Sequence, residues 1–156
     1  MIAQTSRQRA NPNAQEVRFW MTTPVITITR DTHLVEALAV MHEHSIRRLP
    51  VIMANGELCG IVSSGDIRGA QALIAGGVAR SIVVDSLGDT RVRDIMSEPP
   101  ITVQIEARLR EAAMLMLDNK IGGLPVLDDQ GGLVGIITES DLFEALVCYL
   151  DRAAEE

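Results

Sequence analysis

Residues Gly135–Leu142 read GIITESDL, and residues Gly60–Ile67 read GIVSSGDI. In both stretches a run of β-branched residues, typical of a strand, ends at a hydroxyl side chain, and an aspartate follows three residues later. Both stretches therefore predict a strand that leads directly into a helix. They are 75 positions apart, which indicates that the sequence contains a duplication.

The duplication extends well beyond these two stretches. Val17–Ala70 aligns with Val92–Ala145 without a gap, and 20 of the 54 aligned pairs are identical. We therefore expect five parts: an N-terminal arm (1–16), a first repeat (17–70), a linker (71–91), a second repeat (92–150) and a tail (151–156).

Each repeat is predicted to have the order β-α-β-β-α, which gives a mixed α+β fold. Val25–Thr29 and Ile101–Gln104 are β-branched runs that predict the first strands. Asp31 or Thr32 is expected to cap the first helix. Two further strands follow each helix, joined by a glycine-containing turn. The first helix of each repeat is indicated by apolar residues at helical spacing, namely Leu34, Ala37, Leu38 and Met41, and then Leu109, Ala112, Ala113 and Met116.

Composition excludes several classes of function. The net charge of −7 argues against a general nucleic-acid or anionic-membrane binder, because phosphate surfaces require basic partners. No apolar run has the length of a membrane span, so a cytoplasmic location is expected. Cys59 and Cys148 lie in apolar surroundings and are predicted to be small core residues. The histidines are interpreted as surface residues without a metal site, and no nucleophile–base pair predicts an enzyme.

The repeated junction has two interpretations. In the first, Ser63 with Asp66 and Thr138 with Asp141 form capping boxes that satisfy free N–H groups at a helix start. In the second, the junction binds a ligand, because a helix N-terminus attracts phosphate and a carboxylate accepts bonds from the vicinal hydroxyls of a sugar. Both roles are compatible.

Taken together, these motifs resemble a known family. Two copies each of h-M-x-x-x-P-x-x-T, (R/G)-(R/G)-L-P-V and G-h-h-(S/T)-x-x-D occur in order and in register. They are similar to a tandem pair of cystathionine β-synthase (CBS) domains, also called a Bateman module, over about Val17–Leu150. The resemblance implies two repeats related by a pseudo-twofold axis, with their sheets packed together and their helices outside. It also implies two clefts that bind AMP, ADP, ATP, S-adenosylmethionine or NAD(H).

The resemblance also implies the residues of each cleft. Asp66 and Asp141 would hold ribose hydroxyls, while Ser63 and Thr138 would bind phosphate. The remaining residues would contact the base through apolar side chains and backbone. One cleft would join Thr138 and Asp141 to Thr23, Pro24, Val25, Ile46, Arg47 and Arg48. The other would join Ser63 and Asp66 to Pro99, Pro100, Ile121, Gly122 and Gly123.

The two clefts are expected to differ. Arg47 and Arg48 offer guanidinium groups to phosphate, where the second repeat has Gly122 and Gly123. A solvated arginine pair is the alternative interpretation. Glu139 would disfavour a long polyphosphate, so AMP or ADP is predicted over ATP.

The last helix predicts self-association. Residues 142–150 are apolar nearly all round the helix, and its own sheet can cover only one face. We therefore expect a homodimer. The resemblance implies that it senses cellular energy and regulates an unidentified target protein. The alternative is a structural or protein-interaction dimer without a ligand.

Overall fold

The computed structural model describes residues 15–75 and 89–154. The first repeat contains η1 (Val17–Phe19), β1 (Ile28–Thr29), α1 (Leu34–Glu43), β2 (Arg48–Ile52), β3 (Leu58–Ser63) and α2 (Ser64–Ala75). The second contains η2 (Val92–Asp94), β4 (Val103–Gln104), α4 (Leu109–Asn119), β5 (Gly123–Leu127), β6 (Leu133–Thr138) and α5 (Glu139–Ala153). The predicted element order and the mixed α+β class are confirmed.

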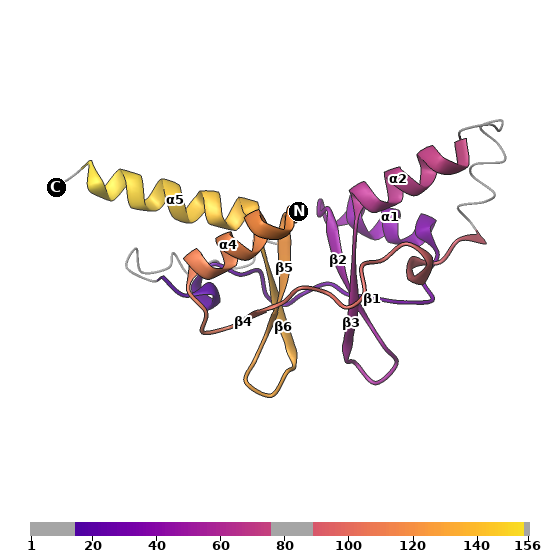
Figure 1. The fold of residues 1–156 in the computed structure, drawn as a ribbon, viewed down its shortest axis with the longest axis horizontal. Helices are drawn as coiled ribbons and strands as arrows, with labels where there is room; N and C mark the ends of the chain where they lie inside the picture. The colour runs from indigo at the N-terminus through magenta and orange to yellow at the C-terminus, as the bar shows by residue number, and fades with distance from the viewer. Residues whose placement is uncertain (1–14, 76–88, 155–156) are drawn as a thin grey trace. The chain divides into compact units, whose positions relative to one another are not determined.

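Two three-stranded sheets form, in the orders β1-β2-β3 and β4-β5-β6 (Figure 1). The first strand of each sheet is parallel to the second, and the second is antiparallel to the third. The first strands are two residues long, shorter than predicted. They pair only with the ends of β2 and β5, and the preceding residues Pro50 and Pro125 have no N–H with which to extend a ladder.

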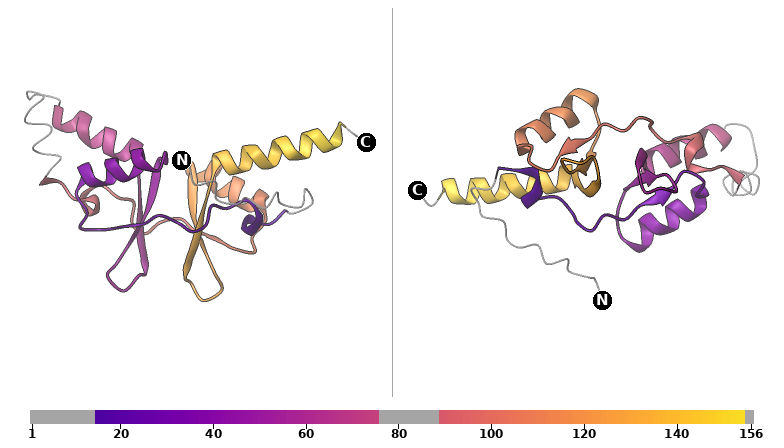
Figure 2. Two further views of the ribbon diagram at one scale, coloured as in Figure 1. Left: turned by 180° about the vertical axis from the view of Figure 1, so that it is seen from behind. Right: turned by 90° about the horizontal axis from the view of Figure 1, so that it is seen from below.

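The described chain divides into two compact units that exchange their leading segments. Unit A comprises the described residues of 26–100, and unit B comprises those of 1–25 and 101–156. In unit A, Val92 N donates to Thr32 O at 2.9 Å. In unit B, Val17 N donates to Ala107 O at 2.8 Å. Each unit therefore joins one repeat's sheet and helices to the start of the other repeat, as the indigo segment beside β4 shows for unit B (labelled in Figure 1; further views in Figure 2).

Each unit has its own apolar core. Val17 and Val92 are fully buried, so the exchanged segments contribute to these cores. Full burial of a valine side chain contributes about 1.5–3 kcal/mol. The core of unit A includes Leu34, Ala37, Met41, Leu49, Val51, Val62, Ile67 and Val92. The core of unit B includes Val17, Val103, Ala112, Met116, Leu124, Val126, Ile137 and Ala145.

Two predictions about single residues are wrong. The N-cap of α1 is His33 and not Asp31 or Thr32, and the Thr32 hydroxyl accepts a bond from Thr29 N at 3.2 Å. Cys148 is exposed, whereas Cys59 is buried as expected and its thiol donates to Val51 O at 3.3 Å. Burial raises the pKa of the Cys59 thiol.

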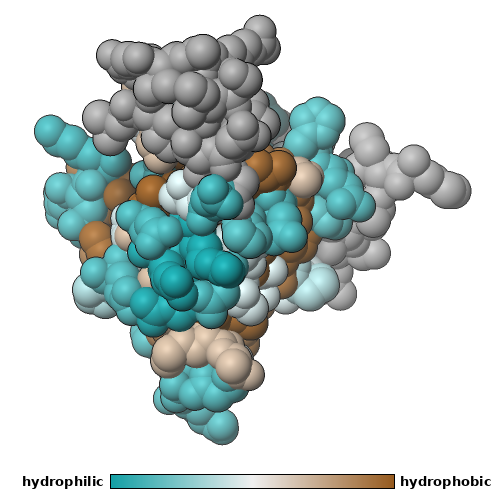
Figure 3. All heavy atoms as spheres, turned by 90° about the vertical axis from the view of Figure 1, so that its right-hand side faces the viewer, coloured by the Kyte–Doolittle hydropathy of each residue, from teal (hydrophilic) through white to brown (hydrophobic). Residues whose placement is uncertain are grey.

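The exposed residues of the described chain bear on further expectations from the sequence. His42 and His44 are exposed, as predicted, whereas His33 is half-buried and its Nδ1 is buried. The face in Figure 3, on the side of α2, is mainly hydrophilic with separate hydrophobic patches. None of the described helices is both long enough and apolar enough to span a bilayer.

Candidate functional site

The two strand-to-helix junctions have the same local geometry. Thr138 donates from its N and its Oγ1 to Asp141 Oδ2, at 2.8 and 2.9 Å. Ser63 donates from its N and its Oγ to Asp66 Oδ2, at 2.7 and 2.6 Å, and Asp66 N donates back to Ser63 Oγ at 3.1 Å. Capping boxes are therefore present at both junctions, which confirms the first of the two interpretations.

The capping bonds from Ser63 and Thr138 go to one carboxylate oxygen, Oδ2, of Asp66 and of Asp141. The helices that follow, α2 and α5, are 12 and 15 residues long, so each has a developed dipole whose positive end lies at the junction. The junctions therefore offer positive potential, a hydroxyl and a carboxylate side by side.

The carboxylates differ in their burial. Asp141 is 2% exposed and is the buried charged residue of the described chain. Asp66 is half-buried. Because a buried carboxylate requires hydrogen-bond donors, substitution of Asp141 is expected to cost more than substitution of Asp66.

In unit A, the sheet brings the arginine pair beside the Ser63 junction. Arg48 pairs with Ser63 in the β2–β3 register, and Ser64 N donates to Arg47 O at 2.9 Å. Arg47 is exposed and Arg48 is half-buried, which fits the expected alternation along a strand. Ile46 and Pro100 belong to the same unit.

In unit B, two glycines replace these arginines beside the Thr138 junction. Gly123 pairs with Thr138, and Glu139 N donates to Gly122 O at 3.2 Å. Ile121 directly precedes this pair and is half-buried. Unit B therefore has no side chain at the position where unit A presents guanidinium groups, and Gly122 is half-buried while Gly123 is buried.

Thr23, Pro24 and Val25 also lie in unit B, together with Thr138 and Asp141. Thr22 N donates to Ile136 O at 2.8 Å, and Ile136 N donates back to Thr22 O at 3.1 Å. This bridge fixes the leading segment along the free edge of β6, immediately before the exposed Thr23 and Pro24. The expected association of Ile46, Arg47 and Arg48 with Thr138 and Asp141 joins residues of different units and stays a prediction.

The structure explains a part of the motif that sequence reasoning missed, its leading glycine. A Cβ on Gly135 would lie 2.7 Å from Met21 Sδ and 3.0 Å from Thr22 O. A Cβ on Gly60 would lie 2.8 Å from Met96 Sδ and 3.0 Å from Ser97 O. Glycine is needed there because the exchanged segment crosses the strand at close range. The available signal was the repetition of both the methionine and the glycine at one offset.

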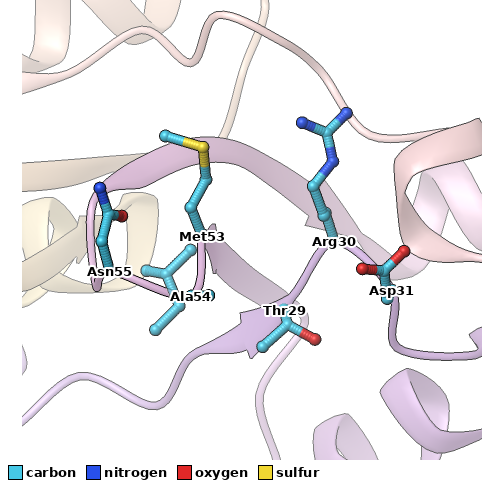
Figure 4. Close-up of a pocket in the computed structure, with 7 residues that line it drawn as sticks. Thr29, Arg30, Asp31, Met53, Ala54 and Asn55 are labelled. Carbon is cyan, nitrogen blue, oxygen red and sulfur yellow. The ribbon is translucent and has the colours of Figure 1, made fainter.

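A separate hollow lies at the opposite end of β2. It has a volume of about 510 Å³ and is lined by residues of the β1 end and the β2–β3 turn, including Arg30, Met53 and Asn55 (Figure 4). Arg30 Nη2 lies 3.7 Å from Glu98 Oε2, and Asp31 forms an ion pair with Arg93. These charges are therefore engaged with each other at the surface. Among the described residues, no group of three potential metal ligands gathers here or elsewhere.

Comparison with known proteins identifies the family. The family model of the CBS domain matches residues 14–73 and 92–148. The chain belongs to the CBS domain family. A CBS domain-containing protein of Dictyostelium discoideum is 36% identical over 135 residues, which cover 86% of this chain and 93% of that protein.

Solved CBS domain pairs share the fold. The pair of protein MJ0100, in complex with 5′-methylthioadenosine and S-adenosyl-L-methionine, matches with a TM-score of 0.71 and 28% identity. The match covers 85% of this chain and 95% of that one. CBSX2 of Arabidopsis thaliana in complex with AMP matches with a TM-score of 0.69 and 29% identity, over 86% and 97% of the two chains. These two CBS proteins thus hold adenosine-containing ligands.

Proposed function

We propose that this CBS protein is a regulatory module that binds an adenosine-containing ligand at its two strand-to-helix junctions. The observation that carries the proposal is the duplicated arrangement of hydroxyl, carboxylate and helix N-terminus at Ser63–Asp66 and Thr138–Asp141. Related CBS pairs hold AMP, S-adenosylmethionine and methylthioadenosine, which supports the ligand class.

The roles follow from the chemistry of each group. Asp66 and Asp141 would accept bonds from the ribose hydroxyls. Ser63 and Thr138, with the N–H groups of the helix start, would donate to phosphate. Arg47 and Arg48 would add charge-assisted bonds to phosphate. Apolar side chains and backbone near Thr23, Pro24, Val25, Ile46, Pro100, Ile121, Gly122 and Gly123 would hold the base.

AMP or ADP is the favoured ligand. Glu139 is exposed in the first turn of α5, beside Thr138, where its carboxylate repels additional phosphate groups. ATP, NAD(H) and S-adenosylmethionine are the competing ligands. The ligand would act by binding one conformation better than another, so that a target protein recognises the favoured conformation. We infer a regulatory and non-catalytic module that acts as a homodimer in the cytoplasm.

A ligand-free structural module is the second candidate function. The capping bonds by themselves give Ser63, Asp66, Thr138 and Asp141 a structural role. In that case these residues would stabilise the helix starts and would have no ligand.

Calorimetric titration separates the two functions. The full chain is titrated with AMP, ADP, ATP, NADH and S-adenosylmethionine, together with the Asp141→Ala variant. Asp118→Ala, which removes an exposed carboxylate on α4, is the matched control. Under the proposed function, AMP binds saturably to the wild type and the control, and at least about tenfold more weakly to Asp141→Ala, which corresponds to about 1.4 kcal/mol.

Thermal melting of the same three proteins distinguishes a lost site from a lost fold. A ligand that binds only the native state raises the melting temperature of the wild type and the control. A loss of AMP binding by Asp141→Ala is assigned to the site only if this variant still unfolds cooperatively. If none of the five ligands binds the folded wild type, the structural function is favoured.

A further inference from the structure

The two strand-to-helix junctions carry different charges around the same capping box. Three positions that flank the box differ between the repeats: they hold Arg48, Ser64 and Arg68 in unit A, and Gly123, Glu139 and Phe143 in unit B. With the shared aspartate included, these positions have two positive charges and one negative charge in unit A. In unit B they have two negative charges and no positive charge. The junctions therefore differ by three charges at equivalent positions.

Arg48 presents its side chain on the same face of the sheet as Ser63. The two residues are directly paired in the β2–β3 register, and paired residues extend to the same side of a sheet. The neighbouring register pair, Leu49 and Val62, is fully buried in the core of unit A. Because side chains alternate along a strand, Arg48 and Ser63 lie on the face opposite that core.

Arg68 approaches the same junction from α2. Its Nη1 lies 3.5 Å from the Oγ of Ser64, which is the first residue of the helix. The guanidinium group therefore lies close to the positive end of the helix dipole, where a cation is unfavourable. A bound anion at this point would compensate for the repulsion.

Gly65 leaves open space between the Ser63 hydroxyl and the Arg68 guanidinium. A Cβ on Gly65 would lie 3.4 Å from Ser63 Oγ and 4.0 Å from Arg68 Nη2. Gly65 is exposed, so a ligand can reach this point from solvent. The equivalent residue of unit B is Ser140, which has a side chain at the corresponding position.

The capping box does not account for the two arginines. The capping bonds of this junction join Ser63 to Asp66 and involve neither Arg48 nor Arg68. Guanidinium groups bind phosphate through paired, charge-assisted hydrogen bonds. Ser63, the helix start and Arg48 suffice for one phosphate group. A second arginine on α2 suits a ligand with further phosphate groups.

We propose that the Ser63–Asp66 junction binds the phosphate chain of ADP or ATP, with Arg48 at the first phosphate and Arg68 at the phosphates beyond it. The Thr138–Asp141 junction has Glu139 and no arginine at the equivalent positions, so it accepts AMP and disfavours a longer phosphate chain. This inference rests on the proposed function. It places Arg48 with Ser63 of its own unit, whereas the family resemblance implies an association with Thr138.

Calorimetric titration of the full chain with AMP, ADP and ATP tests the role of Arg68. Arg68→Ala is expected to weaken ADP and ATP binding about tenfold or more, and to change AMP binding less than about twofold. The preference for ATP over AMP in the wild type is expected to fall with added salt, because exposed charges are screened. Arg110→Ala, which removes an exposed arginine from the start of α4 in unit B, is the matched control.

Gly65→Ala separates binding from stability. The added methyl group makes ordinary van der Waals contacts, and alanine favours a helix more than glycine does. The melting temperature is therefore expected to stay the same or rise. ADP and ATP binding is expected to weaken, because the methyl group occupies the space between the Ser63 hydroxyl and the Arg68 guanidinium. A loss of binding without a loss of stability is not explained by unfolding.

Asp66→Asn and Asp141→Asn show which junction holds the longer phosphate chain. Asparagine keeps a side-chain oxygen for the helix start, so both variants are expected to stay folded, which circular dichroism verifies. ADP and ATP binding is expected to be lost in Asp66→Asn and kept in Asp141→Asn.

Contrary results would overturn the proposal. Equal ADP and ATP affinities in Arg68→Ala and Arg110→Ala would show that Arg68 does not contact the phosphates. Loss of ATP binding in Asp141→Asn but not in Asp66→Asn would assign the phosphate chain to unit B. Saturable binding of AMP without binding of ADP or ATP would contradict this inference and leave the proposed function standing. If none of the three nucleotides binds the folded wild type, both fail.

Discussion

Replacing Gly135 by alanine adds one methyl group at a position without room for it. The added Cβ would lie 2.7 Å from Met21 Sδ and 3.0 Å from Thr22 O. The methionine side chain can rotate away, but Thr22 O cannot move freely, because it accepts a hydrogen bond from Ile136 N. We therefore expect the exchanged segment to shift away from β6, at the cost of about 1–3 kcal/mol that is typical of overpacking.

The free energy of unfolding of Gly135→Ala is measured by urea denaturation and by thermal melting. For a chain of this length, each kcal/mol corresponds to about 2–4 °C in melting temperature. Trp20, the one tryptophan, packs against the core of unit B and adjoins Met21, so its fluorescence reports on the unit that is perturbed. Far-UV circular dichroism follows both units at once.

Two other glycines provide matched comparisons. Gly60→Ala makes the equivalent contacts in unit A, with Met96 Sδ at 2.8 Å and Ser97 O at 3.0 Å, so a similar loss is expected there. Gly69 is exposed within α2 and has no atom within 4 Å of an added Cβ. Gly69→Ala is therefore expected to stabilise the protein by about 0.5–1 kcal/mol, because alanine favours a helix more than glycine does.

The outcome for Gly135→Ala is decisive for the close approach of the exchanged segment. An unchanged or higher melting temperature for Gly135→Ala, alongside the expected gain for Gly69→Ala, would refute the argument that the exchanged segment crosses β6 at close range. Because Thr22 directly precedes Thr23 and Pro24, the proposed function also predicts weaker AMP binding by Gly135→Ala.

Three further predictions concern charge and reactivity. Arg48→Ala is expected to weaken AMP binding about tenfold or more in calorimetry, while adenosine binding changes little. The control is Arg110→Ala, which removes an exposed arginine on α4. Equal losses for AMP and adenosine, or a similar loss of AMP binding in Arg110→Ala, would contradict a phosphate role for Arg48. Glu139→Gln is expected to strengthen ATP binding more than AMP binding, because it removes the negative charge that repels the additional phosphates of ATP. An unchanged ratio of the ATP and AMP dissociation constants would argue against this repulsion. In thiol labelling of the native protein near neutral pH, Cys148 is expected to react quickly and Cys59 only after unfolding, because burial raises the pKa of Cys59 and keeps its thiol neutral. Mass spectrometry of the labelled peptides distinguishes the two cysteines.

The sequence by itself determined the duplication, the order of elements and the capping boxes, because these depend on local chemistry. Helical spacing specifies the buried faces of α1 and α4. A serine or threonine three residues before an aspartate predicts the hydrogen bonds of a capping box, because both partners lie within one turn of the same helix start. The candidate residues Ser63, Asp66, Thr138 and Asp141 could therefore be named from the repeat, and adenosine as the ligand class came from family resemblance.

The tertiary structure decided features that depend on contacts far apart in the chain. No local pattern shows that Val17 is buried beside Ala107, or Val92 beside Thr32, since each exchanged segment gains its burial from the other repeat. The requirement for glycine at positions 60 and 135 follows from that exchange. Cys148 was predicted to be a core residue because its neighbours in the sequence are apolar. A helix at the edge of one unit buries only one face, however, so an apolar neighbourhood does not ensure burial, and Cys148 is exposed.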